Sequence, residues 1–218
     1  MNIAESTVAN AIRYCMRKYC HANIIIAGPI GAGKIALCNE MKDWFEAIEG
    51  SNVAVLSQYN YYKELEDIPC EKYGKKIDSI EAFEKEEFID DVKEFLERGY
   101  TYTPHYYSNW SRKNPIIIQA DKMNHKVELL HKGHINIFVG PHAITLLKGI
   151  VVDAITIYVN TTYSKCIARR VDRGLFLPMP CELEANLQAN YFESFVLPQI
   201  AEEIFPQVND ADLVVTLN

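Results

Sequence analysis

The chain has 218 residues, of which 49% are hydrophobic and 23% are charged, and its formal net charge is -7. This composition is typical of a globular protein with a full core, and the negative charge argues against a general nucleic-acid binder. No apolar run is long enough to span a membrane, and residues 1–20 lack the apolar centre of a signal peptide. The six cysteines form no CxxC pair, so we expect reduced thiols, a cytoplasmic location and no metal site.

Helix and strand patterns alternate in the first half of the chain. They predict, in order, a helix over 5–19, a buried strand over 23–27, a helix over 34–48, a strand over 52–57, a loop over 58–80 and an amphipathic helix over 80–98 that Gly99 ends. Five of the six histidines show no metal-ligand spacing, and we expect them in loops or on the surface; they are His105, His125, His131, His134 and His142.

The second half continues the alternation. Its patterns predict an edge hairpin that includes Ile116 to Ile118, strands over 135–139 and 154–159, a helix over 162–173, a loop over 174–181, a long helix over 182–205 interrupted near Pro198, and a strand over 213–216. Strands that alternate with helices indicate an α/β fold with a doubly wound parallel sheet of about five strands. We expect one domain over 1–218, with a small aromatic-rich capping region within about 58–126.

A glycine-rich turn lies between the strand predicted over 23–27 and the following helix. In GPIGAGKI, Gly28, Gly33 and Lys34 match the pattern G-x-x-x-x-G-K-[ST], and Gly31 adds a third glycine. Glycines let backbone N–H groups point at phosphate oxygens, and Lys34 adds a cation, so the segment predicts ATP binding. A purely structural turn is the alternative. Ile35 stands where a hydroxyl should hold Mg²⁺, and it has no oxygen.

Four stretches resemble the uridine kinase family, within the wider group of phosphoribulokinase and pantothenate kinase. They are the phosphate loop, LSQYNYYK at 56–63, IDSIEAFE at 77–84 and YVNTTYSKCIARRV at 158–171. ADLVV at 211–215 resembles the closing strand of the family, so the likeness runs from about Ile24 to Val215. The resemblance implies a P-loop kinase fold and an ATP-dependent phosphotransferase ancestry, with a nucleoside as the acceptor.

The resemblance implies that the nucleoside side of the site is partly kept. Asp78 falls on the ribose-hydroxyl contact, and Tyr62 and Tyr106 fall on aromatic pocket positions. Trp110 lies nearest the family's base-contacting histidine, and Arg112 ends the matching segment PHYYSNWSR. Eight of the 13 tyrosines lie between residues 59 and 107, which fits either an aromatic-walled pocket or an aromatic core.

The resemblance also shows losses on the catalytic side. Tyr59 occupies the position of the general-base aspartate, and Val139 that of an acidic residue at a strand end. Together with Ile35, these replacements leave no catalytic residue and no metal ligand to assign. Arg169, Arg170 and Arg173 form a tight arginine cluster at the position of the family's lid, where they would close over phosphates; a solvated helix face is the alternative.

Two hypotheses therefore stand. The first is a degenerate member that binds nucleotide, or a nucleoside, without turnover. The second is an active uridine/cytidine or related kinase that uses Mg²⁺ and a relocated base, for which Glu64, Glu66 and Asp67 are the candidates. The missing groups favour the first. Neither hypothesis involves nucleic acid or a membrane, and homo-oligomer formation stays open.

Overall fold

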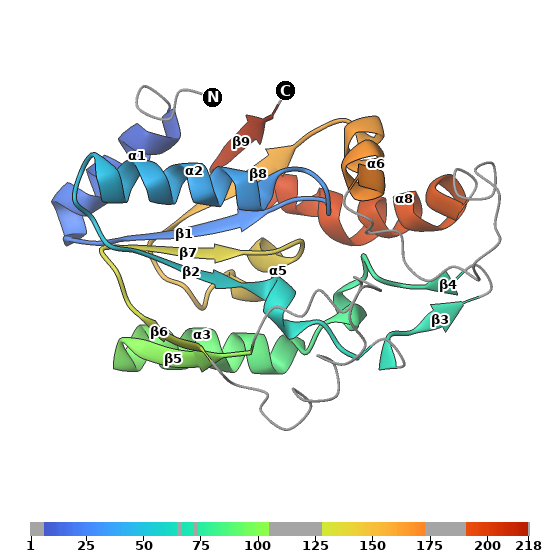
Figure 1. The fold of residues 1–218 in the computed structure, drawn as a ribbon, viewed down its shortest axis with the longest axis horizontal. Coiled ribbons are helices and arrows are strands. Elements are labelled where there is room, and N and C mark those ends of the chain that lie inside the picture. The colour runs from blue at the N-terminus through green and yellow to red at the C-terminus, as the bar shows by residue number, and fades with distance from the viewer. Residues whose placement is uncertain (1–6, 65–66, 72–73, 105–127, 173–190, 218) are drawn as a thin grey trace.

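A five-stranded parallel sheet forms the middle layer of the protein (Figure 1). The computed structural model describes residues 7–64, 67–71, 74–104, 128–172 and 191–217. The strands of the sheet, in spatial order, are β2 (Val53–Ser57), β7 (Ile135–Val139), β1 (Ala22–Ala27), β8 (Ala154–Asn160) and β9 (Leu213–Thr216). The predicted parallel sheet of five strands is confirmed.

The central strands are apolar because both faces of the sheet are covered. Every residue of β1 is buried, and so is every residue of β7. Parallel strands covered by helices on both sides have this continuous apolar character, in contrast to the alternation of half-exposed strands. The runs at 23–27 and 135–139 were therefore recognisable as core strands from the sequence.

Helices pack on both faces of the sheet and make two separate cores (Figure 1). On one face lie α1 (Thr7–Tyr19) and α2 (Lys34–Ala47), whose side chains share a cluster with alternate residues of the central strands. On the other lie α3 (Lys85–Arg98), α5 (Ala143–Leu147) and the helical segment 191–204, which contains α8 (Leu197–Gln199). This second core is rich in phenylalanine.

The connections reverse direction at β1. From β1 the chain crosses through α2 to β2 at one edge, and β7 then inserts between β2 and β1; β8 pairs with β1 on the other side. In open α/β sheets, ligands bind at such a switch point, beyond the carboxyl ends of the strands. The predicted phosphate loop lies there, directly after β1. α6 (Tyr163–Asp172), which follows β8, lies at the same end of the sheet.

The described residues between 58 and 84 contain more regular structure than the expected loop, and the following helix is shorter than predicted. A 3₁₀ turn (Gln58–Tyr61) follows β2, and β3 (Cys70–Glu71) pairs with β4 (Gly74–Lys75). The prediction of one helix over 80–98 was wrong at its start: a 3₁₀ turn (Ile80–Ala82) precedes α3, and extended Phe83 pairs with Tyr62. Phe83 is fully buried against the Tyr62 ring, so tertiary packing overrides the helical pattern there.

Three further features differ from the sequence-based expectation. A ribbon of β5 (Tyr100–Thr103) and β6 (Glu128–His131) packs beside α3, whereas the predicted hairpin at 116–118 lies outside the described residues. α5 was not predicted. The segment 191–204 stays helical through Pro198, with wider π-helical turns on either side of it, so the expected interruption is a change of helix type.

Among the described helices, none is both long and apolar enough to cross a bilayer.

Candidate functional site

The turn between β1 and α2 can form only with glycine at key positions. Gly28, Gly31 and Gly33 have φ values of 140°, 89° and 102°. A Cβ at Gly28 would lie 2.4 Å from the Val159 carbonyl oxygen, and one at Gly31 would lie 2.7 Å from that of Cys166. The loop backbone therefore packs directly on β8 and α6, in a conformation that side-chain-bearing residues rarely adopt.

Lys34 begins α2 and is almost fully buried at 2% exposure. Its Nζ donates to the carbonyl oxygens of Gly28 at 2.6 Å and Pro29 at 2.8 Å. Burial, with a smaller contribution from the Arg170 charge, lowers the pKa of this ammonium group to about 7. The first N–H groups of a helix have no intrahelical acceptor, so Lys34 and the start of α2 together present positive charge to any anion in the loop.

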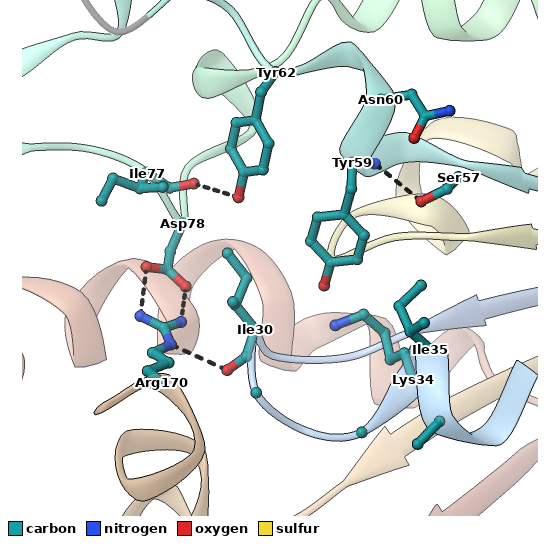
Figure 2. A pocket seen from close by; sticks show the side chains of 13 residues that line it. Ile30, Lys34, Ile35, Ser57, Tyr59, Asn60, Tyr62, Ile77, Asp78 and Arg170 are labelled. Atoms are coloured by element: carbon teal, nitrogen blue, oxygen red, sulfur yellow. Dashed lines mark hydrogen bonds and ion pairs between the residues drawn. The ribbon is translucent and has the colours of Figure 1, made fainter. Parts of the chain in front are cut away.

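A pocket of about 380 Å³ opens directly above this loop (Figure 2). Its described lining comes from the loop, the start of α2, the end of β2 with the turn after it, the segment before Ser79, and α6. The lining residues are Ile30, Gly31, Gly33, Lys34, Ile35, Ala36, Ser57, Tyr59, Asn60, Tyr62, Ile77, Asp78 and Arg170. The sequence-predicted positions at the loop, at Tyr59, at Tyr62 and at Asp78 thus meet in one cavity.

Two predicted positions within the described residues, Val139 and Gly28, do not line this cavity. Val139 is fully buried in the core that α1 and α2 cover. Gly28 shapes the loop from below without lining the pocket. The remaining predicted site residues, which are Tyr106, Trp110, Arg112 and Arg173, lie outside the described residues.

Asp78 and Arg170 form a buried ion pair at one end of the pocket (Figure 2). Arg170 Nη1 donates to Asp78 Oδ2 at 3.1 Å and Nη2 donates to Oδ1, so both carboxylate oxygens are engaged. Arg170 Nε also donates to the Ile30 carbonyl oxygen at 3.2 Å, which ties α6 to the phosphate loop. Sequence reasoning named this arginine only within a cluster; its place in the motif ARRV was the available signal.

Arg169 holds the loop from a different side. Its Nη1 donates to the carbonyl oxygens of Gly31 at 3.2 Å and Ala32 at 3.1 Å. These bonds direct the guanidinium to the loop backbone, and Arg169 is not among the described residues that line the pocket. The lid role expected from the resemblance stays a prediction.

The pocket lining does not fit Mg²⁺. Magnesium needs oxygen ligands in near-ideal octahedral geometry, with one or two carboxylates as the usual protein contribution. Asp78 is the one carboxylate in the described lining, and Arg170 occupies both of its oxygens. Ile35 lines the pocket without an oxygen, and the described residues contain no cluster of three potential metal ligands. Of the three candidates for a relocated base, Glu64 and Asp67 are exposed and are not among the lining residues, and Glu66 lies outside the described residues.

Tyr59 stands over the phosphate loop, where the resemblance places a general base. Its ring centroid lies 5.4 Å from Lys34 Nζ and 6.2 Å from the ring centroid of Tyr62 (Figure 2). Both expected roles occur among the described tyrosines of this region, whereas Tyr100 and Tyr102 are exposed. Tyr59 and Tyr62 line the pocket, whereas Tyr61 is buried in the core and donates to Asp91 Oδ2 at 2.9 Å.

His142 lies in the turn before α5, in agreement with the expected loop position, but it is fully buried and not on the surface. Its Nε2 lies 2.8 Å from the Asp78 carbonyl oxygen, and its backbone N–H donates to Gln58 Oε1 at 3.0 Å. Burial lowers the pKa of His142 to about 4, so the ring is neutral at pH 7 and Nε2–H donates to the carbonyl. This bridge joins the end of β7 to two walls of the pocket. The short sequence FVGPH contains no signal for it.

The buried Lys34 predicts a pH dependence of anion binding. A bound phosphate favours the ammonium form and raises the Lys34 pKa above its value of about 7 in the free protein. Nucleotide binding should therefore take up a proton near pH 8, and affinity should fall as pH rises above about 7.

The same lowered pKa of Lys34 makes the folded state bind fewer protons than the unfolded state between about pH 7 and 10. The free energy of unfolding should therefore rise over this range.

Calorimetric titration in two buffers with different ionisation enthalpies measures this proton uptake. Lys34→Met should abolish the uptake, whereas Lys42→Ala, on an exposed position of the same helix, should keep it. A binding heat that does not depend on the buffer at pH 8 would contradict the prediction.

Known proteins resemble this chain in sequence and in fold. No family model matches it. A uridine kinase from Clostridium botulinum (strain Langeland / NCTC 10281 / Type F) is 27% identical over 201 residues, covering 87% of this chain and 85% of that protein. The solved structure of a candidate fructose transport system kinase from Silicibacter sp. TM1040 has a TM-score of 0.60 at 13% identity, covering 96% of this chain and 99% of that one. That of a possible uridine kinase from Bacillus stearothermophilus has a TM-score of 0.52 at 12% identity, with the same coverage of 96% and 99%.

Proposed function

We propose that this chain, which is uridine-kinase-like in sequence and has a P-loop kinase fold, binds nucleotide and has impaired or absent phosphoryl-transfer activity. One observation carries the proposal. A single pocket combines a phosphate loop of intact glycines and Lys34 with Ile35 and Tyr59 at the positions where catalysis needs oxygen ligands and a base. Phosphoryl transfer depends on positioning and on metal and cation stabilisation of the developing charge.

The residues that remain are suited to holding phosphate. The glycine-rich loop backbone, the N-terminus of α2 and the Lys34 ammonium group can all act on phosphate oxygens directly. None of them needs a metal ion as an intermediary. A nucleotide supplies the phosphates, and the protein contributes a fixed cradle for them and a partly aromatic wall at Tyr59 and Tyr62.

ATP and ADP should therefore bind weakly, and Mg²⁺ should change their affinity little. Calorimetric titration with each nucleotide, in EDTA and again in Mg²⁺, measures both points. Lys34→Ala should reduce the affinity by about tenfold or more, since it removes a charge-assisted hydrogen-bond donor. Lys42→Ala should leave it unchanged.

Two results would count against this proposal. The first is the absence of any binding heat at millimolar nucleotide, which would mean that the loop is only structural. The second is a large gain in affinity on adding Mg²⁺, which would indicate a metal site that the described residues do not provide. A gain of that kind would favour the active-kinase alternative.

A further inference from the structure

The pocket carries little free positive charge. Among its described lining residues, Lys34 is the one cation outside an ion pair, because Arg170 is engaged by both oxygens of Asp78. The Asp78 side chain is 2% exposed and the Arg170 side chain is 8% exposed. Because the two opposite charges lie together away from solvent, they largely cancel each other. A triphosphate normally relies on metal ions to neutralise its charge, and this lining does not fit Mg²⁺.

A single phosphate group matches this charge much better. A phosphate monoester carries about -1.5 to -2 charges at pH 7. The loop amides, the N-terminal end of α2 and the Lys34 ammonium group can neutralise a charge of this size without metal.

Most of the remaining lining is apolar or aromatic, with Ser57 and Asn60 as its polar members, and it is continuous with the loop. Ile30 and Ile35 border the phosphate loop, and Tyr59, Tyr62 and Ile77 continue the wall toward Asp78 (Figure 2). The volume of about 380 Å³ lies at the small end of the range for ligand pockets, about 300–1,000 Å³. This space suits one small ligand better than a phosphate donor and an acceptor together.

We infer that the pocket takes one phosphate monoester of a ring-bearing alcohol, without metal, with its phosphate in the loop and its organic part against Tyr59, Tyr62 and Ile77. This inference rests on the proposed function, because it places phosphate in the same loop. A pocket that takes one monoester differs from a site for two substrates in one measurable respect. The monoester and ATP compete for the loop, so they exclude each other.

Uridine 5′-monophosphate, phenyl phosphate, inorganic phosphate and ATP serve as probes, each titrated in EDTA against the unmodified protein. Both monoesters should bind about tenfold tighter than inorganic phosphate, since a planar ring stacked on an aromatic side chain contributes an effect of this size. They should also bind tighter than ATP, with or without Mg²⁺. ATP should displace uridine 5′-monophosphate completely, with no ternary complex.

Variants locate the two halves of the ligand. Tyr59→Leu keeps an apolar wall but removes the ring, so it should weaken the monoesters and leave inorganic phosphate unchanged. Lys34→Ala should weaken all four probes by about tenfold or more. Lys42→Ala, at an exposed position of α2, should weaken none. The competition measurement on the unmodified protein tests the inference even if a variant fails to fold.

Several outcomes would overturn the inference. These are tighter binding of MgATP than of uridine 5′-monophosphate, equal affinity for inorganic phosphate and both monoesters, and a ternary complex with ATP. If ATP binds in a Lys34-dependent manner while neither monoester binds, the inference fails and the proposed nucleotide-binding function stands. If no phosphate compound binds, both fail.

Discussion

The purified protein should phosphorylate neither uridine nor cytidine above the background of a Lys34→Ala control. General-base catalysis alone contributes about 10²–10⁴-fold, and the phenol of Tyr59 is a poor base at neutral pH. Ile35 lines the pocket without an oxygen, and Val139 is fully buried in an apolar core, so neither can hold a metal ion. A coupled assay for nucleoside-dependent ADP release measures the rate.

Restoring an oxygen ligand and a base in the pocket tests the cause of this inactivity. The double variant Ile35→Ser, Tyr59→Asp should recover measurable phosphorylation, whereas either substitution alone should do little, because catalytic groups that act as a unit have non-additive effects. Val139→Glu should instead destabilise the fold, since it places a carboxylate without a partner among apolar side chains.

The opposite result has a clear interpretation. Nucleoside-dependent ADP release by the unmodified protein, absent from the Lys34→Ala control, would contradict a degenerate kinase. It would mean that a base or a metal ligand has moved to another residue. Glu64, Glu66 and Asp67, which follow the lost aspartate position closely, would then be the first residues to replace.

Replacement of Arg170 by methionine should destabilise the protein by about 3–5 kcal/mol, the usual cost when one partner of a buried ion pair is removed. The loss is large because Asp78 is 1% exposed and would keep a buried carboxylate without its guanidinium. The bond from Arg170 Nε to the Ile30 carbonyl oxygen would be lost as well. Urea unfolding, followed by circular dichroism, measures the change in the free energy of unfolding.

Two controls separate the ion pair from simple loss of packing. The double variant Asp78→Asn, Arg170→Met should recover part of the lost stability, because it removes the unpaired charge. Arg169→Met should cost much less, since Arg169 is only half-buried and donates to the backbone carbonyl groups of Gly31 and Ala32. Equal losses in the single and double variants would show that the charge of Asp78 is not the cause.

The elements with regular patterns were predictable from the sequence for local reasons. The apolar runs 23–27 and 135–139 form β1 and β7, and the glycine pattern of the loop matches its positive φ values. The end of α3 at Gly99 was also predictable, because a residue in the left-handed region there accepts no side chain without strain. These features depend on residues that are neighbours in the sequence, so the local sequence is enough to predict them.

The composition of the pocket depended on contacts between distant segments. Arg170 and Asp78 are 92 residues apart, and His142 lies 64 residues from the Asp78 carbonyl that it contacts. No local pattern distinguishes these side chains from surface residues, because burial is a property of the packed layers. For the same reason Phe83 leaves the helical pattern to pack on Tyr62.

The sequence by itself determined the parallel sheet and the position of the glycine-rich loop, because each is a matter of residue type and spacing. Only the tertiary structure decided that Asp78 is held by Arg170, that Lys34 is buried with a pKa of about 7, and that Val139 lies in the core and is not among the described residues that line the pocket. Charge neutralisation and desolvation act through space, and they depend on which segments the fold brings together.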